Sequence, residues 1–252
     1  MLDRLWKNLI VLAFWLLVWA GLAHLVGREL LLPGPLAVLR RVAQLALTAA
    51  FWRTAGLSLW RILWGAAAGM ALGVLLAAAT CRFRPLDALL RPLLTLIKST
   101  PVASFILLVL IWVGRDVVPP VIVILMVTPV VWGNTAAGIR SADPLLLQMA
   151  QVYRFGPRRT VRRVYLPALL PHLLSACQTA LGLAWKAGVA AEVLTVPQLS
   201  IGKNLFEAKL YLETVDLFAW TVVVIVLSLI IERLLTAAIG RFGRRIPGGE
   251  PV

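Results

Sequence analysis

Charged and hydroxyl-bearing residues interrupt two long apolar runs of this sequence. One group consists of Lys98, Ser99, Thr100 and Pro101, and the other consists of Lys186 and Glu192. Inside a membrane such residues are tolerated against other protein or a water-filled cavity, and they commonly mark the path of a solute or ion. We therefore treat these six residues as candidates for the lining of a translocation pathway.

Each group also has a structural interpretation. Pro101 removes a backbone donor and disfavours helix at Thr100, so this segment borders the pathway or its inner gate, or else Lys98 reaches to the inner interface. Lys186 and Glu192 do not share a helix face, because six residues correspond to about 600° of rotation. A cationic Lys186 suits an anionic solute, but a contact with a neighbouring span explains it equally well.

The longest polar and basic stretch, residues 143–167, predicts two short helices at a membrane surface. Asp143 followed by proline is a helix-start signal, because the carboxylate accepts backbone N–H groups and proline suits the first turn. The first helix is expected to reach about Tyr153, and Gly156 followed by proline starts the second. Pro167 is expected to separate the second helix from the apolar run that follows.

The two short helices differ in character. The first presents Leu146, Ala150 and Tyr153 on one face, and the second carries Arg158, Arg159, Arg162 and Arg163. An apolar face on a short helix outside the membrane must be buried against something, and a basic helix suits an acidic partner or anionic lipid. The stretch therefore predicts a docking element.

Composition places these features in an integral membrane protein. Of 252 residues, 61% are hydrophobic and 14% are charged, so the chain is more apolar and less charged than a soluble domain. A span needs about 20 helical residues. Six apolar runs meet this need, at 9–26 (an uncleaved first span), 58–80, 93–113, 118–139, 166–194 and 215–231, with a basic loop at 81–91 and an interfacial amphipathic helix in 30–55. The predicted fold is all-α, with six transmembrane helices.

Gly65, Gly69 and Gly73 recur every four residues in the second apolar run. Such a stripe of small residues lets helix backbones approach closely within a membrane bundle. We expect it to serve packing and no chemistry.

We attribute the net charge of +14 to the Lys and Arg residues that orient the helices of a membrane protein, and we expect no nucleic acid partner. With the N-terminus inside, the inner segments hold roughly twice as many Lys and Arg residues as the outer segments, which predicts both termini in the cytoplasm. We divide the chain into a first helix with the interfacial helix at 1–57, a core at 58–236 with the polar loop at 141–167, and a basic tail at 237–252.

The polar loop resembles the EAA loop of permease subunits of ATP-binding cassette importers. In that family Glu-Ala-Ala is followed at a fixed distance by Gly, and then by an aliphatic residue two positions before Leu-Pro. This chain has Gln148, Met149 and Ala150 at the first three positions, Arg154 in place of the Gly, Val164 at the aliphatic position, and Leu166 with Pro167 at the end. The segments 58–65, 99–114 and 181–194 are also similar to the importer core, most of all to nitrate, sulfonate and taurine permeases.

The resemblance implies a type I importer permease in the cell membrane of a prokaryote. It implies a second, often identical, permease copy, cytoplasmic ATPases that dock on a two-helix coupling loop, and an external substrate-binding protein. The coupling residues it implies are Asp143, Gln148, Met149, Ala150, Tyr153, Arg154, Gly156, Leu166 and Pro167. Because Gln148 replaces a carboxylate, docking should rest on apolar contact around Ala150, supplemented by the arginines.

The chain contains no Walker-type phosphate loop, so ATP and Mg²⁺ are expected on the partner ATPase. We expect no catalytic residue, cofactor or metal site in this chain.

Two other classes of protein fit part of the pattern. A secondary transporter or channel driven by an ion gradient also uses broken helices and intramembrane charges. However, no inverted repeat is visible, and such a protein does not need a two-helix cytoplasmic loop. A membrane anchor or sensor that binds lipid through its basic loop accounts for the arginines, but not for the helix break followed by Leu-Pro.

Overall fold

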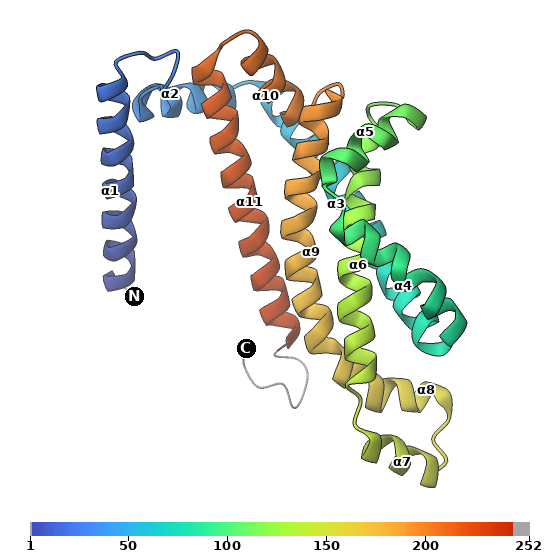
Figure 1. Cartoon of the computed structure of the whole chain (residues 1–252). Helices are drawn as coiled ribbons and strands as arrows, with labels where there is room; N and C mark the ends of the chain where they lie inside the picture. The colour runs from blue at the N-terminus through green and yellow to red at the C-terminus, as the bar shows by residue number, and fades with distance from the viewer. Residues whose placement is uncertain (1, 244–252) are drawn as a thin grey trace.

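The computed structural model describes residues 2–243 of the chain (Figure 1). Every regular element in this part is helical, which confirms the all-α prediction. The helices are α1 (Leu2–Val26), α2 (Pro35–Ala46), α3 (Ala49–Arg82), α4 (Arg84–Ser99), α5 (Val102–Trp112), α6 (Val118–Arg140), α7 (Pro144–Val152), α8 (Pro157–Thr160), α9 (Leu166–Thr195), α10 (Ile201–Leu210) and α11 (Thr214–Gly243), with a π-helical turn at Val161–Tyr165. Residues 244–252 of the expected basic tail lie outside the described range.

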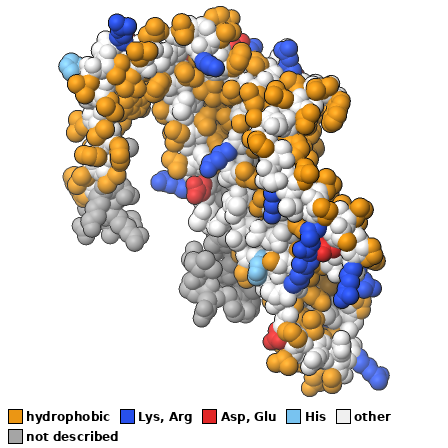
Figure 2. Space-filling view, in the orientation of Figure 1, with side chains coloured by type: hydrophobic (Ala, Val, Ile, Leu, Met, Phe, Trp, Pro, Cys, Tyr) orange, Lys and Arg blue, Asp and Glu red, His pale blue; other side chains and the backbone are white. Residues whose placement is uncertain are grey.

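Within residues 2–243, four helices are long and apolar enough to cross a membrane. They are α3, α6, the continuous helix Pro157–Thr195, and Thr214–Leu234 of α11. The pair α4 and α5 passes the same test together, and the apolar part of α1, Ala13–Val26, is shorter. Hydrophobic side chains cover much of the visible helix surface, as a lipid-facing surface requires (Figure 2). All six apolar runs are therefore helical, while their number as membrane spans stays a prediction.

The core of the fold is the packing of α6 between α3 and α9. A Cβ added to Gly65 would lie 2.8 Å from the Pro120 carbonyl oxygen of α6, and one added to Gly73 would lie 2.8 Å from that of Thr128. Only a residue without a side chain permits this approach. The prediction that the glycine stripe serves helix packing is confirmed.

Helix α2 runs across the ends of α1 and α11 at the top of Figure 1. The Arg41 guanidinium donates to both carboxylate oxygens of Asp216 in α11, at 2.6 and 2.7 Å. The hydrogen bond to Asp216 raises the pKa of Arg41 above its usual value. Trp19 of α1 stacks on Phe218 of α11, with ring centroids 6.0 Å apart. These contacts hold the N-terminal helices to the last helix.

The interfacial helix expected within 30–55 is shorter than predicted. Thr48 separates α2 from α3, and its hydroxyl accepts a hydrogen bond from the Phe51 backbone N–H at 3.3 Å. Threonine at this position caps the N-terminus of α3. Residues 49–57 consequently belong to α3, so the division placed after residue 57 falls inside one helix.

The basic loop expected at 81–91 is almost entirely helical. Phe83 leaves the helical conformation, with φ −119° and ψ 104°, and a proline in the first turn restarts the chain as α4. The chain then bends by 108° between α4 and α5. The expected break before Pro101 is confirmed, but 93–113 is not one straight span, because proline has no N–H with which to continue α4.

Helices α8 and α9 belong to one continuous helix that changes direction at the π-helical turn (Figure 1). The prediction that Pro167 separates the two is wrong. In the turn, the Leu166 N–H donates to the Val161 carbonyl, five residues earlier. Because Pro167 has no N–H for the carbonyl four residues before it, the wider turn accommodates the proline without ending the helix.

Candidate functional site

Helices α7 and α8 form a loop that projects beyond the ends of α6 and α9 (Figure 1). They lie where the sequence predicts two short helices. One Asp143 carboxylate oxygen accepts from the Leu145 backbone N–H at 2.8 Å, as expected for a residue that starts a helix. Asp143 therefore caps the N-terminus of α7.

Arg154 closes the other end of α7 in the left-handed conformation, with φ 49°. The Phe155 N–H donates to the Ala150 carbonyl at 2.8 Å, and the Arg154 N–H donates to the Gln151 carbonyl at 3.0 Å. Together these bonds form a Schellman motif, in which glycine is the usual left-handed residue. The left-handed conformation explains why the family pattern has glycine at the position that Arg154 occupies here.

A small apolar cluster holds α7 against the π-helical turn. Ala150, 3% exposed, packs in it with Val164 and Ala142, and Phe155 and Tyr165 pack against them. The prediction that Ala150 belongs to an outward docking face is wrong, because its side chain lies inside the loop. Ala150 and Val164, two positions of the family pattern, hold the two helices together.

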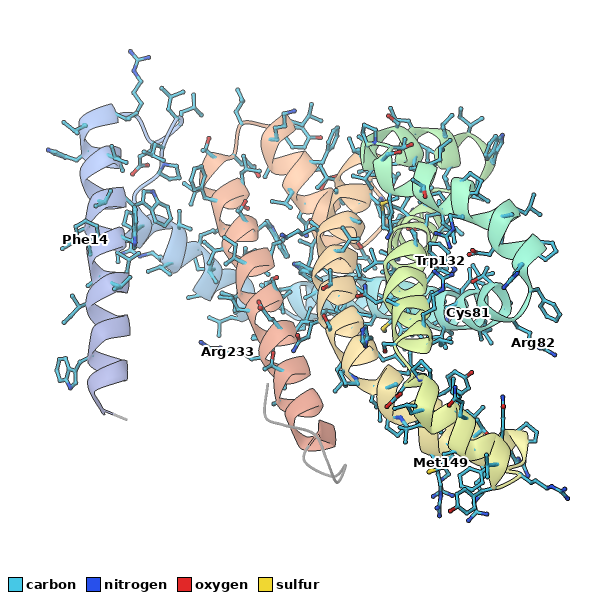
Figure 3. All side chains as sticks on the ribbon, turned by 60° about the horizontal axis from the view of Figure 1, so that its bottom comes forward. Phe14, Cys81, Arg82, Trp132, Met149 and Arg233 are labelled. Carbon is cyan, nitrogen blue, oxygen red and sulfur yellow. The ribbon has the colours of Figure 1, made fainter. Side chains whose placement is uncertain are left out.

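The outward face of α7 is apolar. Large side chains stand exposed on it at Leu145, Leu146, Met149, Val152 and Tyr153. Tyr153 and Val152 are 71% and 79% exposed, and Gln148 is exposed among them. Figure 3 shows Met149 at the outer edge of the loop, away from the bundle. Exposed apolar side chains gathered on one short helix are typical of surfaces that contact another molecule.

Four arginines cover another face of the loop. Arg158, Arg159, Arg162 and Arg163 are all exposed on α8 and the π-helical turn. The Arg159 guanidinium carbon lies 4.6 Å from the centre of the Phe155 ring. Three further candidate coupling residues, Gly156, Leu166 and Pro167, are exposed at the two ends of this basic segment.

The corner between α4 and α5 carries the first group of candidate pathway residues. The hydroxyls of Ser99 and Thr100 donate to the Leu96 carbonyl, at 3.1 and 2.8 Å, and so satisfy an acceptor at the helix end. Lys98 is exposed, and its amine lies beside Gly133 of α6, where an added Cβ would be 3.3 Å away. The corner brings a cation and two hydroxyls to a bend next to α6.

Glu192 is completely buried at the end of α9 remote from the loop. One of its oxygens accepts from the Ser58 hydroxyl at 2.8 Å and from the Gly202 N–H at 3.2 Å. Its other oxygen lies 3.9 Å from the Arg61 guanidinium. These bonds join α9 to α3 and α10, and they favour the structural alternative for Glu192 over a pathway role.

Lys186 lies on an exposed polar stripe of α9. Gln178, Gly182 and Lys186 follow at four-residue spacing, and all three are exposed. They line a cavity of about 340 Å³ between α9 and α11, to which Glu232 also contributes. In the described residues, no carboxylate oxygen lies within 4.0 Å of the Lys186 amine. Lys186 and Glu192 therefore lie in different environments. The four-residue spacing of Gln178, Gly182 and Lys186 is the feature of the sequence that indicates a common helix face at this cavity.

One charged cluster is not evident from the sequence. Asp87 of α4 accepts from Arg91 at 2.6 Å and lies 3.6 Å from Arg140 at the end of α6. It borders a cavity of about 720 Å³ that Leu147 and Tyr165 of the loop also line. The four-residue spacing of Asp87 and Arg91 indicates one pair, but the contact with Arg140 depends on how α4 packs on α6.

Comparison with known proteins gives the family. Residues 69–246 match the family described as the binding-protein-dependent transport system inner membrane component. The chain belongs to this family. It is accordingly a permease component of the ATP-binding cassette importers, as the loop and core segments predict.

Relatives of this permease extend over most of its length. It is 31% identical over 210 residues to an ABC transporter permease protein of Brucella melitensis, which covers 82% of this chain and 84% of the relative. The taurine transport system permease protein of Escherichia coli is 26% identical, over 90% of this chain and 84% of the relative. The nitrate import permease protein of Leptolyngbya laminosa is 32% identical, over 58% and 52%. Together with an aliphatic sulfonates transport permease protein of Bacillus subtilis, these relatives confirm the expected resemblance to nitrate, sulfonate and taurine permeases.

A solved structure shares the fold of the permease. A crystal structure of an amino acid ABC transporter with histidines aligns with a TM-score of 0.60 and 16% identity, over 75% of this chain and 90% of that one. At this identity the likeness concerns the fold, and it confirms the importer permease fold class.

Proposed function

We propose that this permease conducts a small anionic or polar solute and is driven by a separate ATPase that docks on the outward face of α7. The exposed apolar face of α7, fixed to the loop by the buried contact between Ala150 and Val164, carries the proposal. ATP and Mg²⁺ bind to the partner, since this chain has no phosphate-binding loop of its own.

The proposed docking uses a helix in a groove. Leu145, Met149 and Val152 follow at spacings of four and three residues, the pattern by which a short helix anchors in a hydrophobic groove. Tyr153 stands exposed beside them, and aromatic anchors contribute strongly to interfaces. Gln148 carries no charge, so the affinity depends on apolar contact and is only weakly reduced by salt.

The proposed solute path follows the polar stripe of α9. A lysine in the middle of a span costs about 3 kcal/mol unless it faces water or another protein group. We place Lys186 on the path, with the corner at Lys98, Ser99, Thr100 and Pro101 near its inner gate, and we keep Glu192 as a cross-link between helices. Nitrate is an anion and taurine carries a sulfonate, so the solutes named for two relatives suit a cationic Lys186.

The proposed assembly contains a second, identical permease copy across the polar stripe. An external substrate-binding protein meets the end of the molecule formed by α2, α5 and α10. Both termini lie in the cytoplasm of a prokaryote, which puts the loop of α7 and α8 on the cytoplasmic side, where the excess of Lys and Arg is expected. The core that carries the path and the loop begins with α3.

Purification with the partner ATPase tests the docking. A carboxylate in Tyr153→Asp would be buried unpaired in the groove, and we expect ATPase affinity to fall about 30-fold, as for the loss of an interface anchor. Gln151→Asp is the matched control, because Gln151 is exposed on the other side of α7. Equal ATPase recovery with both variants would refute the docking face.

Uptake by the reconstituted complex tests the path. Lys186→Met removes the cation and keeps an unbranched side chain that is one heavy atom shorter, and we expect uptake of an anionic solute to fall about 10-fold while ATPase assembly is unchanged. Unchanged uptake would assign Lys186 to structure. Uptake that needs an ion gradient and no ATPase would replace the proposal with a secondary transporter.

A further inference from the structure

The four arginines of the loop lack acidic partners. Arg158, Arg159, Arg162 and Arg163 are exposed, and among the described residues no carboxylate oxygen comes within 4.0 Å of any of them. Together they line an open cavity of about 770 Å³. Arg158 and Arg162, like Arg159 and Arg163, are four residues apart and therefore neighbours on the helix, where like charges destabilise each other. The arrangement is a concave cationic site that an anion would stabilise.

The arginines do not share the surface assigned to the ATPase. Val164 of the π-helical turn is buried against Ala150 of α7, whereas the four arginines of α8 and the turn are exposed, so the arginines lie on a different face from the one that contacts α7. In Figure 1, α8 lies between the ends of the bundle and α7. The helix that carries the arginines continues without a break into α9, which is apolar enough to span a membrane. A basic segment that leads directly into a membrane span is expected near the phospholipid headgroups.

We propose that Arg158, Arg159, Arg162 and Arg163 bind the phosphate of an anionic phospholipid of the inner leaflet. Guanidinium groups pair with phosphate oxygens in bidentate geometry, and basic pockets at the cytoplasmic ends of membrane helices suit such headgroups. The bound phosphate offsets the repulsion among the arginines and so holds the π-helical turn against which α7 packs. The proposal rests on the proposed cytoplasmic side of the loop, but not on the docking of the ATPase.

Native mass spectrometry of the purified permease with its ATPase tests the site. The complex in detergent is titrated with phosphatidylglycerol and, separately, with phosphatidylcholine. Each arginine near anionic lipid contributes about a factor of five, so the double variant Arg158→Gln/Arg162→Gln should bind phosphatidylglycerol about 25-fold more weakly than the wild type. Binding of phosphatidylcholine should be weak in both proteins.

Three further variants make the result specific. Arg40→Gln/Arg53→Gln removes the same charge from exposed positions on α2 and α3 and should leave the affinity unchanged. Arg159→Gln/Arg163→Gln should reproduce the loss, so the test does not depend on one variant folding. Arg158→Lys/Arg162→Lys should retain most of the affinity, because lysine also binds phosphate.

Several results would overturn the proposal. They are equal phosphatidylglycerol affinity in the wild type and both Gln variants, equal binding of the two lipids, and full displacement of the lipid by millimolar inorganic phosphate, which would indicate a site for a free anion. Loss of the ATPase with unchanged lipid affinity would assign the arginines to the protein partner. In contrast, failure of the wild type to bind an ATPase at all would refute the proposed function and leave the lipid result standing.

Discussion

Glu192 and the outward face of α7 are opposite cases within one chain. Glu192 is a charged side chain with no exposed surface, and its carboxylate is engaged by Ser58, Gly202 and Arg61. The α7 face consists of large apolar side chains that the rest of the described chain leaves uncovered. Burial of a charge requires internal partners, whereas exposure of apolar surface calls for an external one. We therefore assign the first region to the fold, and we propose that the second serves an assembly.

The comparison also separates two kinds of effect. Changes around Glu192 should reduce the stability of the permease with or without its partners, because the bonds lie within one chain. Changes on the α7 face should alter association with a partner and leave the permease itself equally stable. A substitution near Glu192 that weakens only association, or one on the α7 face that weakens only stability, would contradict this distinction.

The largest effect is expected at Gly202. An added Cβ would overlap the Cβ and the backbone of Glu192, which cannot move away as a flexible side chain could. We expect Gly202→Ala to lower the free energy of unfolding by about 3 kcal/mol, measured by thermal unfolding of the permease in detergent. Gly156→Ala is the control, because a Cβ at Gly156 in the loop meets no atom within 4 Å. Similar unfolding temperatures for the two variants would contradict this account.

Ser58→Ala should have a smaller effect of the same kind. It removes the hydroxyl that donates to Glu192 and that accepts from the Ile201 N–H at 2.9 Å. The Ile201 N–H is then left without a partner, and the Glu192 oxygen keeps only the Gly202 N–H, which should together cost about 2 kcal/mol, while ATPase affinity per folded molecule stays unchanged. The measurement combines thermal unfolding with ATPase binding, and Ser175→Ala, at an exposed position of α9, is the control. A loss of ATPase affinity without a loss of stability would reverse the roles of the two regions.

The smallest effect is expected at Arg154, and its sign is opposite. Glycine adopts the left-handed conformation that arginine holds at a cost, so Arg154→Gly should stabilise the loop by about 1 kcal/mol. Hydrogen exchange of the Phe155 amide, which donates to Ala150, should slow about fivefold. Gln151→Gly, inside α7, should speed the same exchange. Faster exchange in Arg154→Gly would contradict this prediction. It would mean that the arginine side chain stabilises the loop by more than its left-handed backbone conformation destabilises it.

Much of the fold follows from local sequence signals. The apolar runs predict the long helices, the glycine spacing predicts that another helix packs closely on α3, and Asp143 predicts the start of α7. Two of the boundary errors also have local causes. Thr48 is a helix cap that the periodicity alone does not separate from a longer amphipathic helix, and Pro167 is accommodated by a π-helical turn rather than by a break.

The site is less accessible to sequence reasoning, because it depends on which elements meet. The spacing of Ala150 and Tyr153 puts both near one side of α7, but only the packing against Val164 turns Ala150 inward and leaves Tyr153 outside. Glu192 has its partners in α3 and α10, and no periodicity within α9 indicates them. The family pattern gives the positions of the loop, and the structure shows which of them face inward.

Photo-cross-linking in the assembled transporter tests the docking of α7 most directly. A benzophenone amino acid replaces Tyr153 on the outward face in one protein and Gln151 on the other side of the helix in a second. We predict a cross-link to the ATPase from position 153 and none from position 151. A cross-link from 151 alone, or none from 153 in a complex that still contains the ATPase, would contradict the assignment of this face to the motor subunit.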